Sequence, residues 1–259
     1  MSASEDDTWA FYHLDYNPPT FDIFTFINTI VLYGATGIWF TLPEQGKLDE
    51  QRMESIVLPA CRILGMKYVI KKEWPLKYVY PSHGKPRNSH RMGSVLSMKE
   101  PVPWNIPQKY MDMANDRFKG NRPGLVILRQ LDIEPNRNSG PDWRRWASDH
   151  SFDVMEDYSV EPCDLEYRLA CYSLASLNIG SSFGNTFINL YSRNPFLTLR
   201  FLPPGHKSGR EGYWEKCGFP VGSQMPWSDK TQKIVWGGND DYETIEKEFN
   251  SYMEDQSRE

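Results

Sequence analysis

The sequence lacks the features that direct a chain into a membrane or out of the cell. It starts Met1-Ser-Ala-Ser-Glu-Asp-Asp, which is the opposite of the basic start and apolar stretch of a signal peptide. The longest apolar run, residues 21–40, is interrupted by Asp22, Asn28 and two glycines, so it falls short of the ~20 apolar residues that a spanning helix needs. We therefore expect a cytoplasmic protein without a membrane span.

Several motifs of metal and hydrolase chemistry are also missing. The four cysteines form no Cys-x-x-Cys pair, no set of His, Cys and carboxylates has zinc spacing, and no Gly-x-Ser-x-Gly elbow occurs. Asp132 and Glu134 are spaced like a pair of metal-binding carboxylates, but Asp and Glu are common on loops. We expect buried, reduced thiols, no metal and no cofactor.

There is no excess of positive charge, because 29 Lys and Arg stand against 34 Asp and Glu, for a net charge of −5. This balance argues against nucleic acid as a partner. The local exception is Lys71–Arg91, with six basic residues, one acid and interleaved aromatic residues. Such a segment fits a sugar, a nucleotide or single-stranded nucleic acid, or it is an ordinary solvated loop.

What the sequence does have is a regular alternation of strand and helix patterns. No tandem repeat is visible. In the first half, apolar runs bounded by Pro and Gly predict a strand, a helix that Thr20 caps, a second strand, a helix and a third strand. Their predicted ranges are 9–14, 20–33, 36–42, 49–64 and 67–70.

The alternation breaks over 71–107, which has six prolines and reads as a long loop with one short strand near Val95. It restarts with helices at 108–118, 140–149, 161–176 and 184–191, and with strands at 124–128, 152–155, 177–180 and 195–200. A last helix, Tyr242–Met253, is free to pack back on the first half. The fold class is therefore α/β, with two Rossmann-like lobes at 1–105 and 106–259 and parallel sheets.

Two strand ends in the second lobe carry candidate ligand-binding residues, because ligands of parallel sheets bind beyond the carboxyl ends of the strands. Arg129 ends an apolar strand, and a polar loop adds Arg137, Asn138 and Ser139. Arginine presents a fork of donors that suits phosphate oxygens. The alternative is that the two arginines pair with nearby acids such as Asp132 or Glu134.

The second strand end is the turn Asn178-Ile-Gly-Ser-Ser-Phe-Gly-Asn-Thr186. Its small residues allow close approach to the backbone, and a helix that begins near Gly184 directs free N–H groups at an anion. The turn is neither a Walker loop nor a Gly-x-Gly-x-x-Gly motif. An ordinary strand-to-helix turn capped by Ser or Asn explains it equally well.

Two residues of the first lobe are candidate general bases. Asp22 follows the first strand and could take a proton from an acceptor hydroxyl. The alternative is an acid that stabilises a helix N-terminus. His13 is the second candidate, although a histidine near a strand end is more often packed or solvated.

Together the segments around Arg129 and Ser181–Thr186 resemble the nucleotide-binding half of GT-B-type glycosyltransferases, in the fucosyltransferase-like branch. The resemblance covers mainly residues 124–200, and the usual His-x-Arg-Arg pattern is absent, since Ile127 and Gln130 flank a single arginine. It implies metal-independent sugar transfer, with Arg129 on the donor diphosphate. The residues it assigns to the turn beside that ligand are Ser181, Ser182, Asn185 and Thr186.

The leading hypothesis is thus an enzyme that moves a sugar from a nucleotide-sugar held by Arg129, Arg137 and the turn to an acceptor, a glycan or small molecule, activated by Asp22. The rival is a non-catalytic protein of this fold that binds a nucleotide or glycan. A third hypothesis is a glycosyltransferase that modifies DNA through Lys71–Arg91. The sequence leaves the donor, the stereochemical course and the oligomeric state open.

Overall fold

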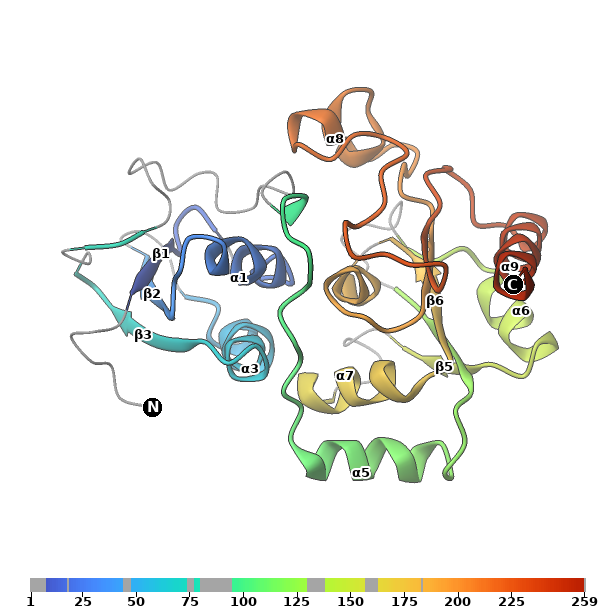
Figure 1. The fold of residues 1–259 in the computed structure, drawn as a ribbon, viewed down its shortest axis with the longest axis horizontal. Helices are drawn as coiled ribbons and strands as arrows, with labels where there is room; N and C mark the ends of the chain where they lie inside the picture. Colours follow the sequence, from blue (N-terminus) through green and yellow to red (C-terminus); the bar gives the residue numbers. More distant parts are fainter. Residues whose placement is uncertain are drawn as a thin grey trace. The chain divides into compact units, whose positions relative to one another are not determined.

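The chain forms two compact units, Met1–Asn105 and Ile106–Glu259, each built on its own parallel sheet. The computed structural model describes residues 8–17, 19–43, 48–73, 77–79, 95–129, 138–156, 163–182 and 184–258. Figure 1 labels the main helices and strands of each unit.

The first unit contains a three-stranded parallel sheet in the order β1-β2-β3, with Trp9 opposite Gly37 and Gly37 opposite Lys67. The predicted parallel strands at 36–42 and 67–70 are confirmed. The elements are β1 Trp9–His13, α1 Ile23–Val31, β2 Gly37–Thr41, α2 Glu50–Arg52, the π-helical η1 Met53–Val57, α3 Leu58–Ile63 and β3 Lys67–Lys71. The last three helical pieces follow one another without a break.

Helix α1 forms the centre of the first core, because Ile23, Phe24, Phe26, Ile27 and Ile30 are all buried. Thr20 was predicted to cap its start. Thr20 Oγ1 accepts from the Asp22 N–H at 3.3 Å and donates to Asp22 Oδ2 at 3.1 Å, while Asp22, the N-cap residue, makes no side-chain capping bond. The helix thus begins at Ile23, and Thr20 orders the turn before it.

The second unit contains a five-stranded parallel sheet in the order β5-β4-β6-β7-β8. The predicted parallel strands at 124–128 and 195–200 are confirmed. The elements are α5 Gln108–Arg117, β4 Gly124–Ile127, α6 Trp143–Asp149, β5 Asp153–Met155, α7 Leu165–Leu174, β6 Leu177–Ser181, the 3₁₀ helix η4 Gly184–Tyr191, β7 Phe196–Leu199, η5 Lys207–Gly209, α8 Tyr213–Lys216, β8 Gln232–Ile234 and α9 Tyr242–Ser257. Strand β8 and helix α8 are additions to the predicted set, and Val95 is helical instead of part of a strand.

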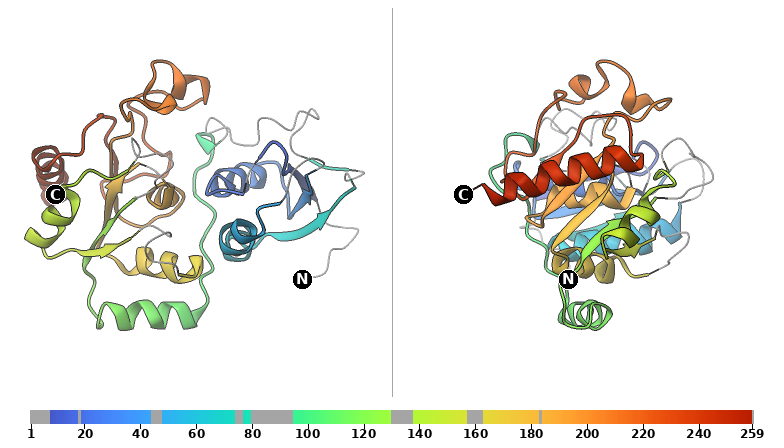
Figure 2. Two further views of the ribbon diagram at one scale, coloured as in Figure 1. Left: turned by 180° about the vertical axis from the view of Figure 1, so that it is seen from behind. Right: turned by 90° about the vertical axis from the view of Figure 1, so that its right-hand side faces the viewer.

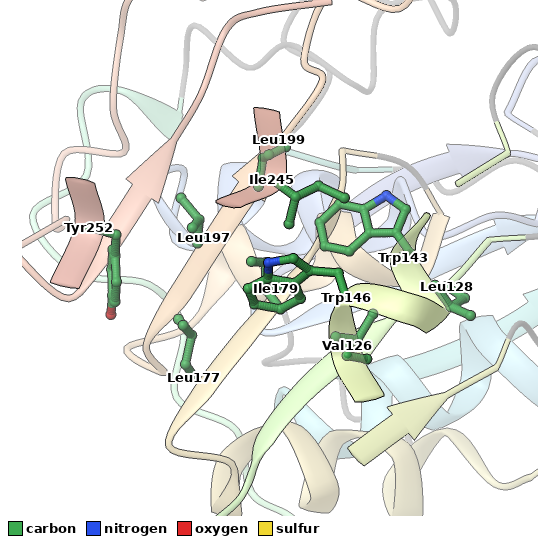
Figure 3. Close-up of a cluster of buried hydrophobic side chains, with 11 residues drawn as sticks. Val126, Leu128, Trp143, Trp146, Leu177, Ile179, Leu197, Leu199, Ile245 and Tyr252 are labelled. Atoms are coloured by element: carbon green, nitrogen blue, oxygen red, sulfur yellow. The ribbon is translucent and has the colours of Figure 1, made fainter. Parts of the chain in front are cut away.

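The C-terminal helix α9 packs on the second unit's own sheet, beside α6. Ile245 and Tyr252 join Trp143 and Trp146 over the strand residues in one buried cluster (Figure 3). In the right-hand view of Figure 2, α9 (red) crosses in front of the strands. The prediction that this helix packs back on the first half is therefore wrong, because its buried apolar face belongs to the core of the second unit.

The order of the second sheet creates a topological switch point between β4 and β6. After β4 the chain passes to β5 at the sheet edge and then returns to β6 on the other side of β4. Figure 1 shows α6 and α9 on one face of this sheet and α7 on the other. Because β4 connects to β5 on one side and β6 connects to β7 on the other, right-handed crossovers carry the loops after β4 and β6 to opposite faces of the sheet. Open parallel sheets bind ligands at such a point.

Candidate functional site

Arg129 lies just beyond the carboxyl end of β4, at the switch point. Its side chain is only 5% exposed. The Arg129 N–H donates to Ser139 Oγ at 2.9 Å, and the Ser139 N–H donates to the Arg129 carbonyl at 2.9 Å. These two bonds join the two ends of the loop, so both the N–H and the carbonyl of Arg129 are held by Ser139.

The turn after β6 lies directly beside Arg129. Gly184, the first residue of η4, has a left-handed φ of +56°, and a Cβ built on it would lie 3.9 Å from both Cδ and Nη1 of Arg129. The two segments predicted to form one site are therefore neighbours in space. In this position the first N–H groups of η4, which have no intrahelical acceptor, lie near a guanidinium.

The two serine hydroxyls of the turn donate to acceptors within the protein. Ser181 Oγ donates to Asp240 Oδ2 at 2.6 Å, and Ser182 Oγ donates to the Arg200 carbonyl at 2.9 Å. Because each hydroxyl has a single proton, donors to a ligand at this turn come from the backbone and from other side chains. The serines connect β6 to the elements around it.

Asn185 and Thr186 are both buried in the first turn of η4. Thr186 Oγ1 would lie 3.0 Å from a Cβ on Gly180, so η4 packs closely on β6. Both polar atoms of the Asn185 amide lack a hydrogen-bond partner in the part of the chain that the structure describes. A buried amide of this kind is a group that a ligand or an ordered water would satisfy.

Asp240 connects the separate strand ends at this edge of the sheet. Its Oδ2 accepts from three donors: the Gly140 N–H at 2.9 Å, Trp143 Nε1 at 2.8 Å and Ser181 Oγ. A Cβ on Gly140 would lie 3.0 Å from both the carbonyl oxygen and Oδ1 of Asp240, so any larger residue there would press against Asp240. Its other oxygen, Oδ1, lies 3.4 Å from Arg200 Nη1.

Asp240 and Arg200 are site residues that the sequence analysis missed. Arg200 follows the apolar strand β7 just as Arg129 follows β4, so the same signal was available to find it. The sequence around Asp240 gave a weaker indication that this residue belongs to the site. Asp240 stands beside Asp241 before a helix, where either residue could be the cap, and only Asp241 accepts from the Thr244 N–H of α9.

The first-unit candidates belong to a different sheet from Arg129. Asp22 is exposed and lies beyond the carboxyl end of β1. Its negative charge adds to burial in raising the pKa of Tyr12 well above the usual phenol value. His13 is buried, and its Nδ1 accepts from the Asp15 N–H at 3.2 Å, which agrees with a packed histidine.

Of the other residues that the sequence analysis singled out, the structure describes some and leaves others outside the described ranges. Asn138 is described, and its carbonyl accepts from Arg200 Nη1 at 2.7 Å. Arg137, Asp132 and Glu134 lie outside the described residues, as does most of Lys71–Arg91. Within the described part of that segment, Lys71 Nζ lies 4.9 Å from the centre of the Trp39 ring.

Burial keeps two of the four thiols unreactive. No disulfide joins the four cysteines, all of which lie in the described residues, and Cys61 and Cys171 are buried. Burial raises the pKa of the Cys171 thiol to about 12, so the group is protonated at neutral pH. Among the described residues no cluster of His, Cys, Asp and Glu could hold a metal ion.

The chain is therefore an α/β protein of two units, each with a parallel sheet. The carboxyl edge of the second sheet carries polar residues and Arg129 at its switch point. Comparison with protein-family models, curated proteins and solved structures found no match of any of the three kinds. Across the described chain, every helix is too short or too polar to cross a membrane.

Proposed function

We propose that the second unit binds the diphosphate of a nucleotide-sugar beyond β4 and β6, and that the protein transfers the sugar to a glycan or small-molecule acceptor. The observation that carries this proposal is the close approach of the Arg129 side chain to Gly184 at the switch point. An arginine fork and the start of a helix at one point form an arrangement of donors that suits phosphate oxygens.

The same groups would act on the reaction as well as on binding. In sugar transfer the nucleoside diphosphate leaves, and negative charge grows on its terminal phosphate. The Ser139 bonds hold the backbone that carries the Arg129 guanidinium, which would stabilise that charge with little reorganisation during the step. Arg129 thereby lowers the barrier to departure, and the N–H groups at the start of η4 add the positive end of their dipole.

The acceptor half of the reaction falls to the first unit in this proposal. Asp22 is an exposed carboxylate at the carboxyl end of β1, where its sheet presents loops to ligands. It would take the proton from the acceptor hydroxyl as that oxygen attacks the sugar carbon. Thr20 donates to one of its oxygens and so restrains its orientation.

The second candidate is a protein that binds a nucleotide or glycan without transferring a sugar. What favours it is the internal use of both serine protons, on Asp240 and on the Arg200 carbonyl, together with Ile127 in place of a histidine before Arg129. Such a site retains the arginine and the helix start but has fewer side-chain donors for catalysis.

A thermal-shift screen separates these possibilities. The full chain is heated with UDP-, GDP-, ADP-, CMP- and dTDP-sugars, since a ligand of the native state raises the melting temperature. Each nucleotide-sugar that raises the melting temperature is then incubated with the protein, and the products are analysed. Binding with release of the nucleoside diphosphate supports the enzyme, binding without turnover supports the second candidate, and no shift with any sugar contradicts both.

A further inference from the structure

Arg200 occupies the same position on β7 that Arg129 occupies on β4. Strand β6 lies between these two strands, so the arginines flank its carboxyl end. Two strand spacings set their backbones roughly 10 Å apart. An extended arginine side chain is long enough for both guanidinium groups to meet a ligand between them.

The Arg200 guanidinium reaches across the end of β6 toward Arg129. Its Nη1 donates to the Asn138 carbonyl at 2.7 Å. Asn138 precedes Ser139, whose backbone and hydroxyl are bonded to Arg129. The two arginines are thus joined through a single short segment, with the turn of β6 between them.

Arg200 is held in this position at a conformational cost. Its φ is +57°, a left-handed value that residues with a Cβ adopt rarely, and Ser182 Oγ holds its carbonyl. Asp240, anchored by three donors of its own, lies against Nη1. Strained residues that their surroundings hold in place cluster at ligand sites. The side chain keeps 14% of its surface exposed, so solvent reaches it.

We propose that Arg200 is a second ligand-contacting arginine, and that Arg129 and Arg200 clamp a diphosphate group over the end of β6. This inference rests on the proposed function and adds to it the pyrophosphate as the part recognised and a second residue that contacts it. Asp240 sets the direction of the Arg200 guanidinium by holding one of its nitrogen atoms, and the clamp would close around the charge that a leaving diphosphate carries.

The test is titration calorimetry of the full chain with inorganic pyrophosphate. We expect Arg200→Lys to weaken binding about tenfold or more, since lysine keeps the charge but loses the fork. Arg200→Gly should weaken it further while the protein stays folded, because glycine adopts the left-handed φ freely. The matched control is Arg117→Lys, which alters an arginine 2.8 Å from Asp153 at the opposite, amino edge of the same sheet.

The outcomes separate the clamp from the function on which it rests. Weaker binding in Arg129→Lys and in both Arg200 variants, with normal binding in Arg117→Lys, supports the clamp. If Arg129→Lys weakens binding but both Arg200 variants bind like the wild type, the clamp is overturned and the proposed function stands. An equal loss in Arg117→Lys also overturns the clamp. If the wild type binds neither pyrophosphate nor any nucleotide-sugar, both proposals fail.

Discussion

At the scale of single residues, Asp240 is the group on which the carboxyl edge of the second sheet depends. One oxygen accepts from Gly140, Trp143 and Ser181, which belong to the loop after β4, to α6 and to β6. Three donors that meet at one buried carboxylate lose their acceptor together if it is removed. The loop, the helix and the strand are therefore coupled through one side chain.

We expect Asp240→Ala to lower the free energy of unfolding by about 3–5 kcal/mol, because it leaves buried donors unsatisfied and the Arg200 guanidinium without its carboxylate. Urea denaturation followed by tryptophan fluorescence measures this loss. The neighbouring Asp241→Ala is the control. It removes only the cap of α9, so it should cost about 1 kcal/mol. Equal losses in the two variants would show that Asp240 has no special role.

Only part of this site could be predicted from single residues. Arg129 and the 181–186 turn follow from apolar strands that end in polar or small residues, and the structure brings the two together. Asp240 could not be predicted, because the three donors to its Oδ2 lie 59 to 100 residues away in the sequence. Arg200 carries the same local signal as Arg129, but the proline-rich stretch that follows it reads as an ordinary loop.

At the scale of elements, the positions and the parallel direction of the long strands were predictable, while the order of the strands in the sheet and the short or irregular elements were not. Strands such as β4 and β7 are buried and apolar, which is typical of parallel sheets. Strand β8 has three residues, Gln232–Ile234, and two of them are polar. Helix η4 was predicted as a helix, yet it is 3₁₀, and its Gly184, Asn185 and Asn189 are poor α-helix formers.

Helix α9 gives a prediction about how the second unit is held together. Ile245 is fully buried against α6 and the sheet. We expect Ile245→Ala to cost about 2–5 kcal/mol, because it leaves a cavity in this cluster. Chemical denaturation of the full chain measures the loss.

The control on the same helix is Met253→Ala, at a side chain that is 47% exposed. It should change stability by no more than about 0.5 kcal/mol. Equal, small effects of the two substitutions would contradict the packing of α9 on this sheet.

At the scale of the whole molecule, the charge balance bears on the choice of partner. With a net charge of −5, the chain as a whole does not attract polyanions, and Lys71–Arg91 is the basic segment that the sequence offers for such a contact. We expect a fluorescent oligonucleotide to bind weakly or not at all at physiological salt. Fluorescence anisotropy over a series of salt concentrations tests this expectation. Tight binding that weakens steeply with salt would instead favour the DNA-modifying hypothesis.

The central claim is that Arg129 contacts the phosphates of a nucleotide-sugar. Calorimetric titration of Arg129→Lys with the nucleotide-sugar that most stabilises the wild type tests it most directly, with a melting curve of the same variant. The control is Arg122→Lys, at an exposed arginine just before β4, on the opposite edge of the sheet. We predict a loss of about 1–3 kcal/mol in binding free energy for Arg129→Lys alone, with an unchanged melting temperature. Unchanged affinity with a lower melting temperature would contradict the claim, because Arg129 would then hold the fold together and not the ligand.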